Sequence, residues 1–166
     1  DTETPILISG DRYSSAFHWV QFSDNLRNLV DPSDKLIYQA HIYFDKNTSG
    51  SYGSYVNGVF VPSAYEAEEA TSQTGVNRMK PFVEWLRKYN KKGMVGEYGI
   101  PDDDPRWNTV LENMLIYLRD NGVPGTYWSA GPRWGGYRLA VQPSENYTKD
   151  RPQMTVLEKY IVTDPK

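Results

Sequence analysis

Positions 92–101 read KGMVGEYGIP, and this stretch decides the fold because a short apolar run passes directly into a glycine-rich turn. The apolar pair at 94–95 is too short for a helix and predicts a strand that ends near Glu97. A helical stripe begins after the Asp-Pro pair at 104–105 and ends at Gly122. Its apolar members are Trp107, Val110, Leu111, Met114, Leu115 and Leu118. The stretch and its continuation therefore predict one strand–helix unit.

Three further apolar runs have the same form, each short and each followed by polar or glycine-rich residues: 6–8, 36–40 and 126–128. Helical periodicity is clearest over 79–89, with Pro81 in the first turn. A shorter candidate lies at 25–29, and a last helix follows Pro152 with Met154, Leu157 and Ile161 on one face. Strands that alternate with helices imply parallel crossovers. We therefore expect an α/β fold of four parallel βα units, with a long loop at 47–65 after the second strand.

The number of units limits the architecture. A chain of 166 residues with 39% apolar residues has the volume for one core, so we expect a single domain over 1–166. A closed eight-stranded barrel takes about 250 residues and eight units. Four units give an open sheet whose edge strands are unpaired and whose strands are not covered on both faces. The sequence predicts either a small open sheet or half of a barrel.

The composition narrows the classes of function. The net charge of −3, with Lys and Arg dispersed, provides no basic stripe, so nucleic acid is not an expected partner. No long apolar run and no basic start with an apolar stretch occurs, so the sequence predicts neither a membrane span nor a signal peptide. The acidic run at 102–104 lacks the ligand spacing of a calcium loop and fits a helix N-terminus. We expect no metal and no cofactor.

Aromatic residues are abundant, at 14% of the chain. Flat rings stack on the apolar faces of a pyranose, so this content is compatible with sugar binding. Trp128 and Trp134 lie at the end of the fourth predicted strand and in the loop after it, where stacking on a sugar is the functional interpretation. Packing of these rings against the sheet is the structural alternative.

Polar or aromatic residues follow the carboxyl ends of the predicted strands, the edge at which parallel α/β folds build active sites. They are Arg12, Tyr13, His41, Tyr43, Glu97 and Trp128. His41 and Tyr43 are two positions apart, so their side chains point to the same side of one strand. Taken alone, this pair also fits a core histidine with a tyrosine at its rim, and Glu97 fits a surface or ion-paired carboxylate.

Three motifs occur in order along the chain: HIYFD at 41–45, GEYG at 96–99 and TYWSAGP at 126–132. Together they resemble the second half of glycoside hydrolase family 5, a (β/α)₈ clan of cellulases, mannanases and relatives. The resemblance implies that the four units are strands five to eight of a TIM barrel. It implies that Glu97 is the catalytic nucleophile, that His41 and Tyr43 hold the sugar and the nucleophile, and that Trp128 floors the subsite where the bond breaks. Tyr13 and Trp134 are further candidate substrate-binding residues.

One element of the family pattern is missing. Retaining glycosidases need a second carboxylic acid about 5–5.5 Å from the nucleophile. The family places it in an Asn-Glu pair at the end of strand four, and this chain contains no such pair. The two glutamates that neighbour an asparagine, Glu112 and Glu145, do not end a predicted strand.

The resemblance therefore implies a retaining endo-β-1,4-glucanase, secreted as in the family, that acts on cellulose or a related β-glucan. Its acid/base would come from an N-terminal half-barrel chain, and this chain alone is expected to be inactive. Two alternatives stay open. One is a non-catalytic glucan-binding half-barrel that self-assembles, and the other is a β-mannanase of the same family.

Overall fold

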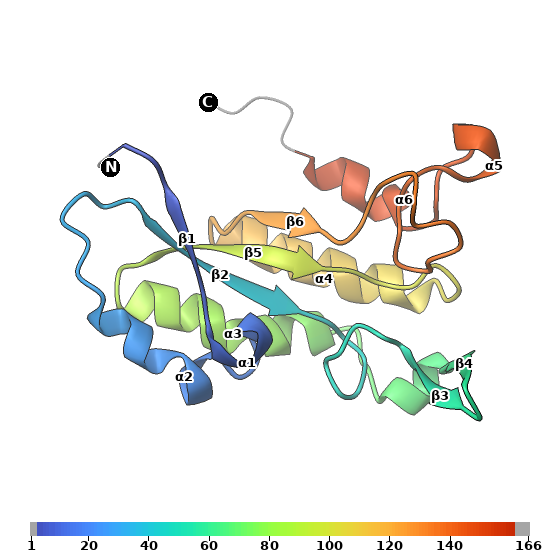
Figure 1. The fold of residues 1–166 in the computed structure, drawn as a ribbon, viewed down its shortest axis with the longest axis horizontal. Helices are drawn as coiled ribbons and strands as arrows, with labels where there is room; N and C mark the ends of the chain where they lie inside the picture. Colours follow the sequence, from blue (N-terminus) through green and yellow to red (C-terminus); the bar gives the residue numbers. More distant parts are fainter. Residues whose placement is uncertain (1–2, 162–166) are drawn as a thin grey trace.

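The computed structural model describes residues 3–161, and these residues contain a four-stranded parallel sheet. Its strands lie in the order β1 (Ile6–Ser9), β2 (Leu36–Ile42), β5 (Lys92–Tyr98) and β6 (Gly125–Tyr127). The two long helices, α3 (Thr74–Lys88) and α4 (Arg106–Asp120), both lie behind the sheet in Figure 1. The predicted α/β architecture with four parallel strands is confirmed.

One face of this sheet is covered and the other is open. On β2, Tyr38, Ala40 and Ile42 are buried, whereas the alternating residues between them are partly exposed. On the edge strand β1, Ile6 and Leu7 are 49% and 51% exposed, and only Ile8 packs on the core. Because successive strand residues point to opposite faces, the helices bury one face and the second face has no layer over it within the described residues.

The core lies between the sheet and the two long helices. The apolar stripe predicted for α4 is buried in full, and Gly122 closes this helix at a φ of +66°. The helix predicted from 79 begins earlier, at Thr74, so the placement of Pro81 in its first turn was wrong. The extra turn contains Gly75, where an added Cβ would lie 2.9 Å from the Cβ of Met114. The lack of a side chain at Gly75 therefore lets α3 approach α4 closely at this turn.

The remaining helical segments are short. They are α1 (Asp11–Ser14), α2 (Trp19–Phe22) and η1 (Asp24–Asn28) after β1, and α5 (Ser144–Tyr147), α6 (Met154–Leu157) and η3 (Glu158–Tyr160) after β6. The helix predicted after Pro152 is thus one short turn followed by a 3₁₀ turn. Ile161 lies beyond both turns and is 57% exposed, so its placement on one helical face with Met154 and Leu157 was wrong.

The segment predicted as a long loop contains an antiparallel hairpin. Its strands are β3 (Gly53–Val56) and β4 (Val59–Pro62), followed by the 3₁₀ turn η2 (Tyr65–Glu68). Asn57 and Gly58 join the strands with φ values of +50° and +79°. An Asn-Gly pair between apolar residues is a hairpin signal, so the sequence did contain this information.

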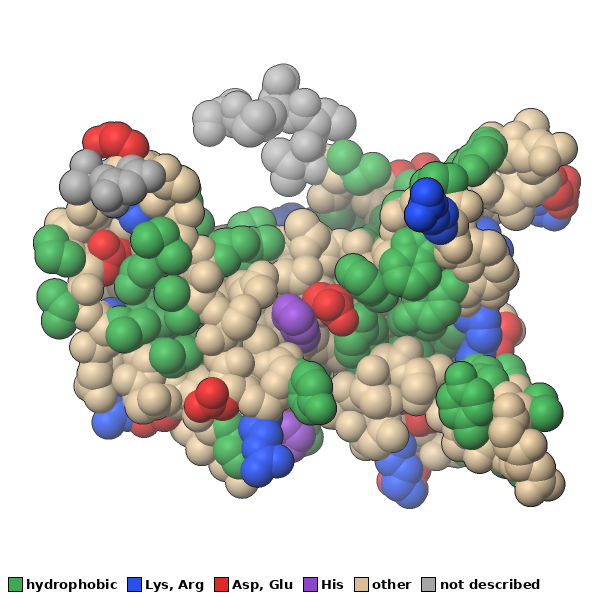
Figure 2. Space-filling model, in the orientation of Figure 1, with side chains coloured by type: hydrophobic (Ala, Val, Ile, Leu, Met, Phe, Trp, Pro, Cys, Tyr) green, Lys and Arg blue, Asp and Glu red, His purple; other side chains and the backbone are tan. Residues whose placement is uncertain are grey.

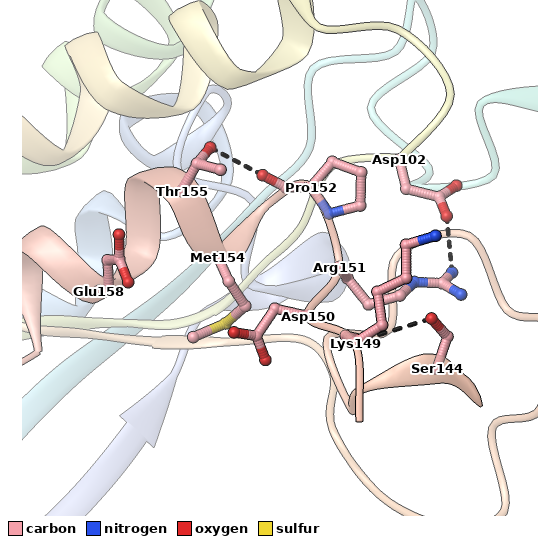
Figure 3. A pocket seen from close by; sticks show the side chains of 9 residues that line it. All are labelled: Asp102, Ser144, Lys149, Asp150, Arg151, Pro152, Met154, Thr155 and Glu158. Carbon is pink, nitrogen blue, oxygen red and sulfur yellow. Dashed lines mark hydrogen bonds and ion pairs between the residues drawn. The ribbon is translucent and has the colours of Figure 1, made fainter. Parts of the chain in front are cut away.

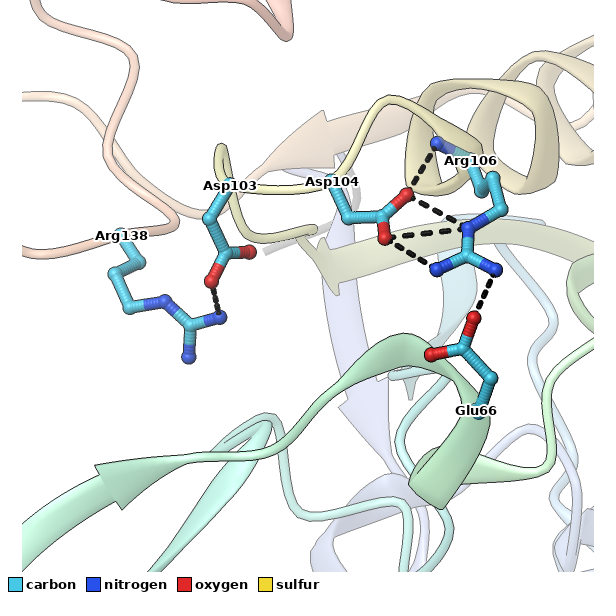
Figure 4. A network of polar contacts seen from close by, with 5 residues as sticks. All are labelled: Glu66, Asp103, Asp104, Arg106 and Arg138. Atoms are coloured by element: carbon cyan, nitrogen blue, oxygen red, sulfur yellow. Dashed lines mark hydrogen bonds and ion pairs between the residues drawn. The ribbon is translucent and has the colours of Figure 1, made fainter.

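The acidic run at 102–104 is paired with arginines from separate segments. Asp102 contacts Arg151 at 2.7 Å, Asp103 contacts Arg138, and Asp104 contacts Arg106 at 2.6 Å. Figure 4 shows the Arg106 guanidinium between Asp104 and Glu66, where it joins η2 to the start of α4. The Asp104 carboxylate also accepts the backbone N–H of Arg106 at 2.9 Å, as expected at a helix start.

Within residues 3–161 no helix is long and apolar enough to cross a membrane.

Candidate active site

The carboxyl ends of β2 and β5 bring distant residues together. The parallel register pairs His41 with Glu97 and Ile42 with Tyr98, after a shift in the ladder between Ala40 and His41. In Figure 2 a histidine and an acidic side chain adjoin at the middle of the molecular face. Side chains more than fifty positions apart thus meet at the edge where sequence reasoning expected a site.

The Glu97 carboxylate contacts both polar side chains of the neighbouring strand. The Tyr43 hydroxyl donates a hydrogen bond of 2.5 Å to Glu97 Oε1. His41 Nδ1 lies 3.7 Å from Glu97 Oε2, which becomes an ion pair when the imidazole is protonated. His41 and Tyr43 therefore lie on the same side, as their spacing predicts, and each faces a different oxygen of one carboxylate.

The two partners of Glu97 differ in burial. Tyr43 is 7% exposed, whereas the side chains of His41 and Glu97 are 29% and 27% exposed. The alternative of a core histidine beside a rim tyrosine is therefore wrong, because Tyr43 is the buried residue of the pair and His41 is the partly exposed one. Burial raises the pKa of Tyr43 far above its ordinary value, and the hydrogen bond and charge of Glu97 add to the rise. The hydroxyl consequently stays protonated and remains a donor to the carboxylate.

A cleft of about 730 Å³ opens beside this group. Tyr13, which is 94% exposed, lies at its wall together with Arg12, and both have a positive φ. The lining residues are Arg12, Tyr13, Ser15, His18, Phe22, His41, Ile42, Tyr43, Asn47, Thr48, Ser49 and Glu97. Glu97 is the sole carboxylate among these lining residues. His18 and Asn47 were not predicted as site residues.

Trp128 and Trp134 form a separate aromatic group with Tyr137. The Trp128 and Trp134 rings are 5.2 Å apart, and Trp134 stacks on Tyr137 at 5.0 Å and 29°. These three residues are not part of the cleft lining. The pKa of Tyr137 lies above its ordinary value, mainly because the side chain is buried. The Glu97 charge adds to the rise, and a hydrogen bond with the Trp128 side chain opposes it. The aromatic group therefore lies within electrostatic reach of Glu97, and Trp128 is 39% exposed.

A second cavity, of about 460 Å³, lies elsewhere and contains none of the predicted site residues. Figure 3 shows the Asp102 and Arg151 side chains directed toward each other at its rim. Lys149, which also lines it, forms an ion pair with Glu145 at 3.0 Å. Three of the charged side chains that line this cavity, Asp102, Arg151 and Lys149, are therefore already paired with other protein side chains. Across residues 3–161 no cluster of three or more His, Cys, Asp or Glu side chains could hold a metal ion.

Known proteins are similar to this chain in sequence and in fold. Residues 1–133 match the family model of Cellulase (glycosyl hydrolase family 5). The chain is 31% identical over 163 residues to a probable endo-beta-1,4-glucanase B of Aspergillus oryzae, covering 96% of this chain and 44% of that protein.

Solved structures of endoglucanases are also similar to this chain. The endoglucanase Cel5A of Pseudomonas stutzeri in complex with cellobiose is 44% identical with a TM-score of 0.82, over 100% of this chain and 46% of that one. XacCel5A in complex with cellopentaose is 30% identical with a TM-score of 0.78, over 95% and 48%. The chain thus spans about half the length of the relatives it matches. Since the family model covers most of its residues, the chain belongs to glycosyl hydrolase family 5.

Proposed function

We propose that this chain supplies the nucleophile of a retaining endo-β-1,4-glucanase, with Glu97 as that nucleophile. The observation that carries the proposal is the Glu97 carboxylate, held by the Tyr43 hydroxyl at 2.5 Å and faced by His41 at the mouth of a cleft. Relatives named endo-beta-1,4-glucanases, and a similar structure in complex with cellobiose, support a β-1,4-linked glucan as the substrate.

The reaction follows from this arrangement in two steps. A carboxylate oxygen of Glu97 bonds to the anomeric carbon while the bond to the leaving oxygen breaks, and a second carboxylic acid protonates that oxygen. The second group, now a carboxylate, deprotonates a water that displaces Glu97 from the sugar. Tyr43 keeps one Glu97 oxygen fixed, and His41 holds the carboxylate and sugar from the other side. Trp128 floors the subsite of cleavage, and Trp134 and Tyr13 bind neighbouring sugar rings by stacking.

The second carboxylic acid comes from an N-terminal half-barrel. Glu97 is the sole carboxylate among the lining residues of its cleft, whereas a retaining pair needs two carboxyl groups about 5–5.5 Å apart. The four units correspond to strands five to eight of a TIM barrel, and the other half covers the open face. Support comes from the edge positions of β1 and β6, from the exposed Leu7, and from the coverage of less than half of each relative. Secretion, which the family resemblance implies, stays a prediction.

The test is a chimera that completes the barrel. The N-terminal half of the Pseudomonas stutzeri endoglucanase is fused to this chain, because that protein is 44% identical over the shared half. The chimera and the isolated chain are assayed on carboxymethyl cellulose and cello-oligosaccharides. Glu97→Gln is the test variant, and Glu84→Gln, an exposed position on α3, is the matched control. A 2-deoxy-2-fluoro-cellobiosyl fluoride then traps the nucleophile for peptide mass mapping.

We expect turnover by the chimera and by its Glu84→Gln variant, with the label on Glu97. Loss of the nucleophile leaves only residual catalysis, so Glu97→Gln should lower turnover by several orders of magnitude. Full turnover by the isolated chain would contradict the assignment of the acid/base to another half. Binding of cello-oligosaccharide by a self-assembled chain, with no cleavage by the chimera and no label, would instead establish the glucan-binding module. Preference for mannan over glucan would establish the mannanase.

A further inference from the structure

Tyr52 lies in the loop between β2 and the hairpin, yet it is almost completely buried. Its exposed fraction is 1%, and its φ is +48°. The hydroxyl accepts the backbone N–H of Phe44 at 3.0 Å and donates to the carbonyl of Gly99 at 2.7 Å. One hydroxyl has a single proton and free lone pairs, so it satisfies both backbone groups at once.

The two backbone partners of Tyr52 adjoin the proposed catalytic pair. Phe44 directly follows Tyr43, and Gly99 lies two residues beyond Glu97. The ladder between β2 and β5 ends at the pairing of Ile42 with Tyr98. The Tyr52 hydroxyl therefore joins the two chain segments just beyond the point where the strands stop pairing.

The loop that carries Tyr52 is fixed by buried polar contacts. Asp45 is 1% exposed, and its carboxylate accepts the Gly50 N–H at 3.0 Å and the Ser49 hydroxyl at 2.8 Å. Arg78 donates to the carbonyls of Tyr43 and Asp45, each at 2.7 Å. These bonds fix the chain on both sides of Phe44. The loop is therefore held against the carboxyl end of β2, from which it starts.

Gly50 brings the loop against the ring of Tyr43. Its φ is +77°, and an added Cβ would lie 2.8 Å from atoms of that ring. The Tyr52 ring approaches the Tyr43 ring edge-on at 6.5 Å and packs on Trp107 at 4.9 Å. The Tyr43 side chain is therefore enclosed by the loop, and its hydroxyl points to Glu97.

We propose that Tyr52 is a positioning residue that sets the geometry between Tyr43 and Glu97 by tying the backbone after each of them. The inference rests on the proposed role of Glu97 as nucleophile. Tyr52 itself is buried behind Tyr43 and acts on the reaction only through the Tyr43–Glu97 hydrogen bond. Its removal therefore changes the reaction step more than the binding of the sugar.

The test compares Tyr52→Phe with Tyr38→Phe in the complete protein that carries this chain. Tyr38 is a matched control, because it is also 1% exposed and its hydroxyl donates to the carbonyl of Leu26 at 3.1 Å. The first readout is the ¹H NMR signal of the Tyr43 hydroxyl proton, assigned with ¹³C-labelled tyrosine. The second is kcat and KM on cello-oligosaccharide, and the third is the melting temperature.

We expect Tyr52→Phe to lose more thermal stability than Tyr38→Phe, because its hydroxyl has two backbone partners and that of Tyr38 has one. Only Tyr52→Phe should shift the Tyr43 hydroxyl signal. We also expect Tyr52→Phe to lower kcat by roughly ten-fold, the effect of weakening one hydrogen bond near developing charge, with KM little changed. An unshifted Tyr43 signal in folded Tyr52→Phe would overturn the inference. The NMR readout needs no turnover, so an inactive wild type would refute the proposed function and leave this comparison decisive.

A further measurement covers the case in which Tyr52→Phe does not fold. In the wild-type protein the Phe44 amide should exchange slowly with deuterium, because it is bound to the buried Tyr52 hydroxyl. Rapid exchange of this amide, at the rate of unprotected loop amides, would contradict the hydrogen bond between Phe44 and Tyr52 and would overturn the inference.

Discussion

Replacement of Tyr43 by phenylalanine should reduce turnover in the completed enzyme while leaving the cleft intact. The change removes the hydroxyl that donates to Glu97 Oε1 at 2.5 Å. The ring stays in place, because it is enclosed by its own loop and is only 7% exposed. The carboxylate thus loses one fixed donor while its surroundings keep their shape.

The magnitude follows from the type of bond. A hydrogen bond to a charged group contributes about 1.5–3 kcal/mol. At about 1.4 kcal/mol per factor of ten, this corresponds to a loss of about 10- to 150-fold in kcat/KM. The hydroxyl is available at every working pH, because burial and the neighbouring Glu97 keep the pKa of Tyr43 far above neutrality. The loss should therefore be present across the whole neutral range.

The assay is steady-state hydrolysis of cello-oligosaccharide by the chimera that completes the barrel. Tyr98→Phe is the control, because Tyr98 follows Glu97 directly, points to the opposite face of the strand, and has a pKa raised to about 12 by burial. We expect the control to keep turnover close to that of the wild type. Unchanged kcat/KM in Tyr43→Phe would refute the reasoning that the Tyr43 hydroxyl stabilises Glu97 by its hydrogen bond. An equal loss in both variants would show that the loss comes from altered packing and not from the missing hydrogen bond.

Three other changes test the surrounding structure. Gly50→Ala should cost about 1–3 kcal/mol in urea unfolding and also lower turnover, because the residue has a φ of +77° and its Cβ would press on the Tyr43 ring; unchanged values would contradict this. Asp31→Asn should destabilise the fold at pH 7 and match the wild type at low pH. The N–H of Leu36 and its neighbours hold the pKa of Asp31 below its ordinary 3.8, so its stabilisation is complete above that value and is lost as pH falls through the folded-state pKa. Denaturation at both pH values checks the sign. Arg106→Ala should lower the melting temperature by less than about 4 °C in a thermal scan, since exposed ion pairs contribute little, and a larger drop would give that network a structural role.

The local sequence pattern was sufficient to predict an element where the apolar residues of that segment alone indicate a strand or a helix. The four strands and the stripe of α4 followed from apolar runs of the right length and period. The start of α3 did not, because Gly75 and its neighbours have weak helical propensity, although the helix begins at Thr74. The hairpin at 53–62 was missed although its Asn57-Gly58 turn was readable.

The sequence by itself determined the order of the βα units, the family, and the edge of the sheet at which polar residues gather, because these depend on spacing along the chain. Only the tertiary structure decided which side chains touch. The pairing of β2 with β5 places Tyr43 and His41 on the two oxygens of Glu97, and the loop fold buries Tyr43 and leaves His41 open. Tyr52 gave no signal in the sequence, because its partners are backbone groups 8 and 47 positions away that meet only when the strands pair.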